Sequence, residues 1–131
     1  MRPDIILVVD DEPVVLKIVA SILSSAGFEV LPAGSPEAAL AAARLHPEPI
    51  QLLLSDVVMP GLRGPDLAEA LRSLHPETAW LFMAGLPDTA EVSERILDRG
   101  LPFLSKPFDA RTLLNKVEEV LGRRSLAAAA G

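Results

Sequence analysis

Short, uninterrupted runs of β-forming residues alternate with helical apolar periods along the chain, and this alternation constrains the fold more than any other feature. Residues 5–9 are all β-formers, the pattern of a strand buried on both faces. The apolar residues that follow recur at helical spacing (Val15, Ile18, Val19 and Ile22) and predict an amphipathic helix that Gly27 ends. Further strands are expected at residues 28–31, 52–54, 80–83 and 101–104, and further helices after the N-cap Ser35, at residues 66–74, from Asp88 to near Gly100, and after Asp109.

Five strands alternating with five helices predict an α/β fold in one domain. Parallel β-α-β units with right-handed crossovers place helices on both faces of the sheet, which gives three layers. A chain of 131 residues has the length of one ordinary domain. We expect residues 1–122 to form this domain and residues 123–131, which are mostly alanine, to form a tail. In such sheets, ligands bind at the carboxyl ends of the strands, where the strand order reverses.

The composition argues against several classes of function. Twelve Lys and Arg against eighteen Asp and Glu give a net charge of −6, which disfavours binding to nucleic acid. The longest uncharged stretch, residues 18–28, is far shorter than the roughly 20 residues that span a bilayer. There is no cysteine, no secretory leader pattern and only two histidines. We therefore expect a soluble cytoplasmic domain without direct membrane contact, whose site is built from carboxylates.

Charged residues follow three of the expected strands, at the edge where a ligand is expected. Asp10, Asp11 and Glu12 come after the first strand, Asp56 after the third and Lys106 after the fifth. Each has an ordinary interpretation on its own: acids at a helix start, an acid in a turn, or an exposed lysine before a turn. Their occurrence together at one edge favours a site, because converging carboxylates repel one another unless a cation is present. Hard oxygen ligands of this kind suit Mg²⁺.

The charged strand ends lie in three segments that resemble the receiver (CheY-like) domain of two-component response regulators. These segments are residues 6–12 (ILVVDDE), 53–61 (LLSDVVMPG) and 103–108 (FLSKPF), and the resemblance covers roughly residues 4–122. Residues 81–85 and 103–108 are most similar to receivers fused to hybrid sensor histidine kinases. The resemblance implies a flavodoxin-like (βα)5 three-layer sandwich with a five-stranded parallel sheet of order 2-1-3-4-5.

The resemblance also implies roles for individual residues. Asp56 would accept a phosphoryl group from a phosphohistidine, and Lys106 would contact the phosphoryl oxygens during this catalytic step. Mg²⁺ would be the cofactor, and the protein would catalyse only its own phosphorylation and slow dephosphorylation rather than act as an enzyme in the usual sense. The implied metal ligands are Asp10, Asp11, Asp56 and the carbonyl of Val58, the implied switch positions are Ala84 and Phe103, and the bond before Pro107 would be cis.

Ala84 departs from the family pattern, in which a Ser or Thr at this position donates a hydrogen bond to the phosphoryl group. Thr78 and Thr89 lie too far from the strand end to replace this hydroxyl. Ser55 and Ser105 each precede a site residue, so strand alternation should point them away from the site. A hydrogen bond to a charged group contributes roughly 1.5–3 kcal/mol, so its loss should slow phosphoryl chemistry about 10- to 100-fold. We expect a receiver that accepts phosphate but switches poorly.

Several alternatives remain open at the level of sequence. Ala84 is compatible with a degenerate receiver that acts as an interaction module independent of phosphorylation. A Mg²⁺-dependent phosphohydrolase of another α/β family would need an acid where Val58 stands. A flavodoxin-type domain would need Ser, Thr and Gly after the first strand, where acids would repel a phosphate. Val58 and Leu86 are both apolar at positions that control water access in the family, which predicts slow hydrolysis of the acyl phosphate.

A receiver implies protein partners. The phosphodonor would be a histidine kinase or a histidine phosphotransfer domain, and the similarity to hybrid kinases leaves open that the domain is part of a membrane-associated kinase. Apolar residues on the last two helices, such as Val92 and Val120, fit either core contacts or a homodimer through these helices. Core contacts are the simpler interpretation.

Overall fold

The computed structural model describes residues 3–85, 96 and 99–122, and in this part of the chain strands and helices alternate as the sequence predicts. The expected helix that begins at Asp88 lies almost wholly outside the described residues. The elements are β1 (Ile5–Val9), α1 (Pro13–Ser25), β2 (Glu29–Ala33), α2 (Pro36–Leu45), β3 (Leu52–Asp56), α3 (Gly64–Arg72), β4 (Ala79–Gly85), β5 (Phe103–Lys106) and α5 (Ala110–Leu121).

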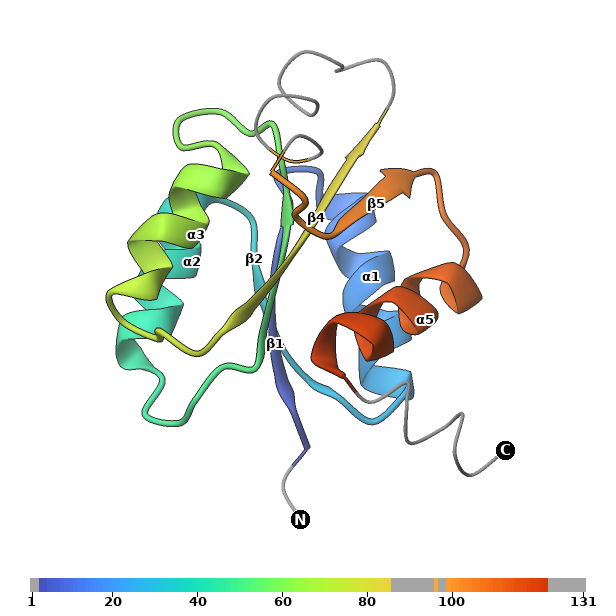
Figure 1. Ribbon diagram of the computed structural model, residues 1–131, viewed down its shortest axis with the longest axis horizontal. Helices are drawn as coiled ribbons and strands as arrows, with labels where there is room; N and C mark the ends of the chain where they lie inside the picture. Colours follow the sequence, from blue (N-terminus) through green and yellow to red (C-terminus); the bar gives the residue numbers. More distant parts are fainter. Residues whose placement is uncertain (1–2, 86–95, 97–98, 123–131) are drawn as a thin grey trace.

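The five strands form one parallel sheet of order β2-β1-β3-β4-β5, which confirms the predicted topology (Figure 1). From β1 the chain crosses to β2 on one side, and the later strands build out on the other side from β3. The strand order therefore reverses between β1 and β3. The carboxyl ends of these two strands mark the expected ligand edge.

Helices cover both faces of the sheet, so the three-layer prediction is confirmed. In Figure 1, α2 and α3 lie on one side of the sheet and α1 and α5 on the other. Alternate residues of β1 point to opposite faces, with Leu7 in the core beneath α2 and α3 and Val8 in the core beneath α1 and α5. The whole of β1 is buried, as its uninterrupted apolar sequence predicts.

The first helix differs from its predicted apolar stripe at one position. Val19 and Leu23 are buried against the sheet, whereas Ile18 is 54% exposed and Val14 is 70% exposed. The buried face of α1 is centred on Val19 and Leu23, so Ile18 falls at its edge rather than in the core. The prediction that Ile18 belongs to the buried stripe is wrong.

The fifth strand begins two residues later than predicted, at Phe103 instead of residue 101. The N–H of Leu101 donates to the carbonyl of Ile96, which ties Leu101 to the preceding segment. Phe103 pairs with Phe82 of β4, so the ladder starts there. The strand also ends two residues later than predicted, so Lys106 is its last residue rather than a residue beyond it.

The edge strand β2 contains a proline. Pro32 pairs with Val8 on its inner side and has no N–H group. A proline in a strand is tolerated at a sheet edge, where no further strand needs that donor.

Helix capping follows the predictions. Ser35 accepts a hydrogen bond from the N–H of Ala38 at the start of α2, and Asp109 accepts one from the N–H of Thr112 at the start of α5. The left-handed conformation of Gly122 ends α5. None of the helices in the described part of the chain combines the length and the apolar character needed to cross a bilayer.

Candidate functional site

The carboxyl ends of β1 and β3 bring three predicted acids together. Asp10 and Asp11 follow β1, and Asp56 is the last residue of β3. One carboxylate oxygen from each lies within 4.8 Å of the others. Asp10 and Asp56 are buried whereas Asp11 is exposed, so the cluster opens to solvent on the side of Asp11. Parallel strands that end at one edge explain this convergence of residues far apart in sequence.

Lys106 stands opposite the acids at the end of β5. Its Nζ donates to Asp10 Oδ2 at 2.9 Å and to Asp56 Oδ2 at 3.4 Å. It also lies 3.5 Å from Glu12 Oε1, an ion pair that the sequence analysis did not assign to the site. The position of Glu12 directly after two acids was the only sequence signal for this contact. One ammonium group is thus shared among three carboxylates.

Asp10 holds its place through a further hydrogen bond. Its Oδ1 accepts the N–H of Glu12 at 2.9 Å, and its side chain is fully buried. Because both oxygens of this carboxylate have partners, the Asp10–Lys106 pair is a fixed part of the site. Asp11, by contrast, is exposed to solvent.

The electrostatics of the site centre on Asp56. Burial raises the pKa of the Asp56 carboxyl to about 6; the nearby charge of Lys106 opposes this rise, whereas Asp10 and Asp11 add to it. Burial lowers the pKa of Lys106, but its hydrogen bond to Asp10 and the negative charges of Asp56 and Asp10 outweigh this effect and raise the pKa above its ordinary value. Lys106 is therefore charged at neutral pH, and the ionised form of Asp56 carries an electrostatic cost.

The donor set fits a hard divalent cation. Asp10, Asp11 and Asp56 carry more negative charge than the one ammonium group of Lys106 can compensate, since Lys106 also pairs with Glu12, and the raised pKa of Asp56 reflects part of that excess. Carboxylate oxygens around an opening to solvent are what Mg²⁺ accepts, since it retains several waters. Val58, whose carbonyl is the fourth implied ligand, lies half-buried in the loop that follows Asp56.

The two positions that the family resemblance implies as a switch lie in β4 and β5, near the ends of these strands. Ala84 is 2% exposed and Phe103 is half-buried, and both belong to the apolar core beneath α2 and α3. The peptide bond between Lys106 and Pro107 is cis, the geometry that the family resemblance implies. Leu86 and Thr89, for which the sequence analysis also made predictions, lie outside the described residues.

The hydroxyl groups that the sequence analysis considered as replacements at Ala84 have other surroundings in the described structure. The hydroxyl of Ser55 donates to the carbonyl of Asp56 at 2.9 Å, and that of Thr78 donates to the carbonyl of Ile50 at 2.7 Å. Ser105 is exposed. None of these three is placed to donate to a group on the Asp56 carboxylate.

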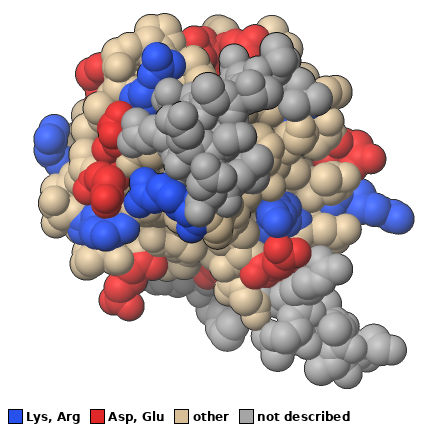
Figure 2. Space-filling model, turned by 45° about the horizontal axis from the view of Figure 1, so that its top comes forward, with Lys and Arg blue, Asp and Glu red and all other residues tan. Residues whose placement is uncertain are grey.

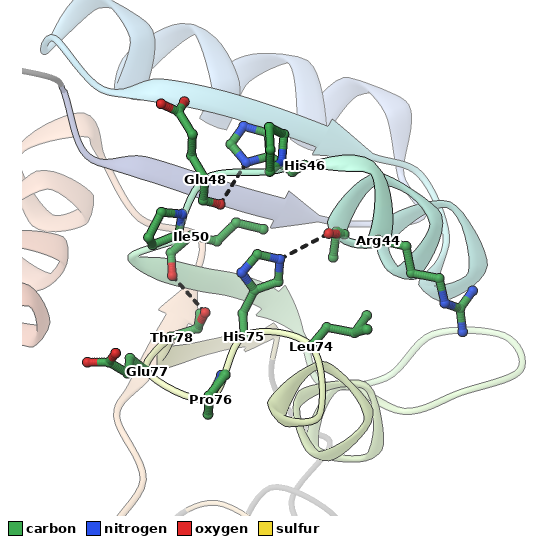
Figure 3. Close-up of a pocket in the computed structure, with 12 residues that line it drawn as sticks. Arg44, His46, Glu48, Ile50, Leu74, His75, Pro76, Glu77 and Thr78 are labelled. Carbon is green, nitrogen blue, oxygen red and sulfur yellow. Dashed lines mark hydrogen bonds between the residues drawn. The ribbon is translucent and has the colours of Figure 1, made fainter.

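A cavity of about 360 Å³ lies at the opposite end of the sheet, around the amino ends of β3 and β4 (Figure 3). Both histidines line it. His46 Nδ1 bonds to the carbonyl of Glu48 at 2.9 Å, and His75 Nε2 bonds to the carbonyl of Ala43 at 3.0 Å. Each ring thus bonds to a main-chain carbonyl, that of Glu48 in the following loop or that of Ala43 in the last turn of α2. The acidic cluster is therefore a better candidate for a functional site than the cavity at the opposite end of the sheet.

Charge on the face that Figure 2 shows is mixed. Figure 2 shows basic and acidic side chains interspersed around the visible surface of the described residues, rather than gathered into one basic field. With a net charge of −6 for the chain, this surface offers little attraction to a phosphate backbone.

The comparisons with known proteins agree with this geometry. Residues 6–118 match the model of the response regulator receiver domain. The response regulator receiver protein CpdR of Brucella abortus is 33% identical over 116 residues, which cover 88% of this chain and 95% of CpdR. Sensor kinase CckA of the same organism is 33% identical over 119 residues, which cover 91% of this chain but 13% of the kinase.

Solved structures give the same result. The receiver domain of the hybrid histidine kinase CckA is 36% identical, with a TM-score of 0.74 and coverage of 89% of this chain and 98% of that one. The chemotaxis protein CheY4 of Vibrio cholerae is 30% identical, with a TM-score of 0.78 and coverage of 90% and 98%.

Proposed function

This chain belongs to the response regulator receiver domain family, and on that premise we propose that Asp56 accepts a phosphoryl group from the phosphohistidine of a histidine kinase or a histidine phosphotransfer domain. The observation that supports this proposal most directly is the convergence of Asp10, Asp11 and Asp56 at one edge of the sheet, with the ammonium group of Lys106 bound to Asp10 and Asp56. A carboxylate is already ionised and needs no strong base to activate it as the nucleophile. The transfer does need positive charge held near the phosphoryl oxygens.

The transfer is an in-line displacement. A carboxylate oxygen of Asp56 attacks phosphorus, the bond between phosphorus and the donor imidazole nitrogen breaks, and its electron pair stays on that nitrogen. Negative charge in the transition state lies on the equatorial oxygens, and the Nζ of Lys106, 3.4 Å from Asp56, is close enough to contact one of them. The amides of Val58 and Gly85 are candidates for further hydrogen bonds to these oxygens, whereas the amide of Val57 already donates to the carbonyl of Met83.

We propose that the acidic cluster holds Mg²⁺ through Asp10, Asp11, Asp56 and the carbonyl of Val58. When bound, the ion supplies the positive charge that lets an anionic phosphoryl group approach three carboxylates. Asp10 keeps its hydrogen bonds to Lys106 and Glu12 and anchors the cluster, while the exposed Asp11 gives access from solvent.

A candidate surface for the phosphodonor lies on α1, the helix that begins two residues after Asp11. Val14 and Ile18 are exposed by 70% and 54%, lie one helical turn apart on α1, and follow Asp11 closely in the chain. A pair of exposed apolar side chains next to an acceptor favours protein contact there. We propose that the domain carrying the phosphohistidine packs on this part of α1, so that its imidazole reaches Asp56.

Ala84 supports a second candidate function, that of a receiver whose partners recognise it without phosphorylation. The methyl group of Ala84 offers no hydrogen bond to a phosphoryl group, so phosphorylation would shift the conformation less. The retained acids and Lys106 favour the phosphoacceptor function. Because Val58 and Leu86 are both apolar and neither can orient a water molecule, we expect slow hydrolysis of the acyl phosphate with either function.

Labelling with acetyl phosphate tests the proposal. With Mg²⁺ present, intact mass should show one added phosphoryl group on the wild type and on Asp4→Asn, a control at the far end of β1, and none on Asp56→Asn. Beryllofluoride should shift the NMR signals of the wild type but not those of Asp56→Asn. Failure of the wild type to react would refute phosphoacceptance and favour the second candidate, and equal labelling of Asp56→Asn would show that another group is the acceptor.

A further inference from the structure

The backbone directly behind Asp56 is held by three hydrogen bonds that do not involve its carboxylate. The buried hydroxyl of Ser55 donates to the carbonyl of Asp56 at 2.9 Å. The N–H of Val57 donates to the carbonyl of Met83 in β4 at 2.9 Å, and the carbonyl of Val57 accepts the N–H of Gly64 at 2.9 Å. The two peptide groups that follow the acceptor are therefore held in place: the first by Ser55 and by the neighbouring strand β4, and the second by the start of α3.

Gly64 makes the closest approach to this peptide. A Cβ at position 64 would overlap the carbonyl oxygen of Asp56 and lie 3.1 Å from Val57 Cα and 3.2 Å from the carbonyl carbon of Asp56. All three are main-chain atoms, so no flexible side chain can move aside. Gly64 does not have a positive φ, so its backbone conformation is open to other residues and the need for glycine is steric.

From this arrangement we infer that Ser55 and Gly64 form a backbone clamp that positions Asp56, and that both are positioning residues for phosphoryl transfer. The inference rests on the proposed function of Asp56 and adds two residues to it. Neither contacts the carboxylate: Ser55 acts through the carbonyl of Asp56, and Gly64 acts by leaving room for that carbonyl while holding Val57.

The clamp matters because the Asp56 carboxylate must keep its distance to three other side chains. Its Oδ2 lies 3.4 Å from Lys106 Nζ, and its carboxylate must share space with those of Asp10 and Asp11. A side chain at position 64 would push the end of β3 away from α3 and so displace the carboxylate relative to these partners. A misplacement of about 1 Å can slow a positioned reaction roughly 100-fold.

Gly64→Ala and Gly61→Ala form a matched pair for the test. Gly61 lies in the same loop and has a φ of 87°, so alanine there is strained, but its Cβ would meet only Glu37 Oε2 at 3.5 Å. Both variants should therefore lose stability, and only Gly64→Ala should disturb Asp56. At a temperature where both are folded, we expect acetyl phosphate labelling of Gly64→Ala to be roughly 10- to 100-fold slower than wild type, and that of Gly61→Ala to stay within about twofold. Equal rates for the two variants would overturn the inference.

Ser55→Ala keeps the test decisive if Gly64→Ala does not fold. Ser105→Ala is its control, because Ser105 holds the same place before Lys106 and is exposed. We expect labelling of Ser55→Ala to be several-fold slower with little change for Ser105→Ala, and an unchanged rate in Ser55→Ala would overturn the role of the hydroxyl.

Mg²⁺ affinity, followed by NMR titration, separates this inference from the proposed function. If the wild type takes no phosphoryl group, the proposed function fails. The clamp is then decided by metal binding alone: affinity at least about tenfold weaker in Gly64→Ala than in Gly61→Ala supports it, and equal affinity in the two variants overturns it.

Discussion

Replacing Asp56 by Asn should stabilise the metal-free protein at neutral pH, even though it removes the proposed acceptor. Burial raises the pKa of Asp56 from 3.8 to about 6. Between these two values the unfolded chain releases the proton and the folded protein retains it, so the contribution of Asp56 to stability falls as the pH rises. Above pH 6 the full penalty is present, and Asn, which carries no charge, avoids it.

The size of the effect follows from the shift in pKa. Each pKa unit corresponds to about 1.4 kcal/mol, so the upper limit is about 3 kcal/mol. Asn retains an oxygen that can accept from Lys106, but the bond is weaker without the charge. We therefore expect a gain of about 1–3 kcal/mol, which for a domain of this size raises Tm by about 3–10 °C.

Thermal and urea denaturation in a chelating buffer measure this gain. It should be present at about pH 7.5 and vanish at about pH 4, where Asp56 of the wild type is protonated in the folded state. Glu12→Gln is the matched control, because it removes one carboxylate near Lys106 whose side chain is 64% exposed. The reasoning is refuted if Asp56→Asn is no more stable than wild type at the higher pH, or if its advantage is the same at both.

Three further predictions concern the metal, the switch and the donor. Saturating Mg²⁺ should raise the Tm of the wild type but not that of Asp11→Asn, and an equal rise in both would exclude Asp11 as a ligand. Ala84→Ser should speed labelling by acetyl phosphate about 10- to 100-fold. On phosphorylation, its NMR shifts between Leu86 and Asp109 should be larger than those of the wild type; shifts of equal size in the two proteins would contradict the expected poor switching. Ile18→Glu should slow transfer from a phosphohistidine donor at least about tenfold without slowing acetyl phosphate labelling, whereas Leu45→Glu, exposed at the far end of α2, should slow neither.

The strand order and the acidic edge could be predicted because both follow from simple periodic features. Continuous apolar runs identify buried parallel strands, and the chain itself fixes which residues follow each strand. Asp10, Asp56 and Lys106 therefore reach one edge whatever the details of side-chain packing. The caps at Ser35 and Asp109 were equally predictable, because a single oxygen and the next few N–H groups suffice.

The exact extent of elements was less predictable, because it depends on neighbours far along the chain. An apolar run at residues 101–104 gives no information on which residue first pairs with β4, and the bond from Leu101 to Ile96 moves that point to Phe103. The exposure of Ile18 depends on how α1 is rotated about its axis against the sheet. The apolar periodicity of the helix does not fix this rotation, so a residue at the edge of the apolar stripe can be exposed.

The backbone around Asp56 was beyond sequence reasoning for a different reason. Strand alternation correctly turns the hydroxyl of Ser55 away from the carboxylate, but the bond that it makes to the carbonyl of Asp56 depends on rotamer and local geometry. A glycine such as Gly64 has no pattern that separates a close approach from an ordinary turn. Contacts of this kind require coordinates.

The proline in β2 bears on how this domain can sit beside other copies or other domains. Its missing donor interrupts the outer margin of the sheet, and the opposite margin is formed by a strand of only four residues, β5. Among the described residues, neither margin offers a long row of free main-chain groups to which a foreign strand could be added. Such a unit can be tethered at high local concentration next to other folded modules and remain separate from them, so that its associations are governed by side chains on its helices and loops.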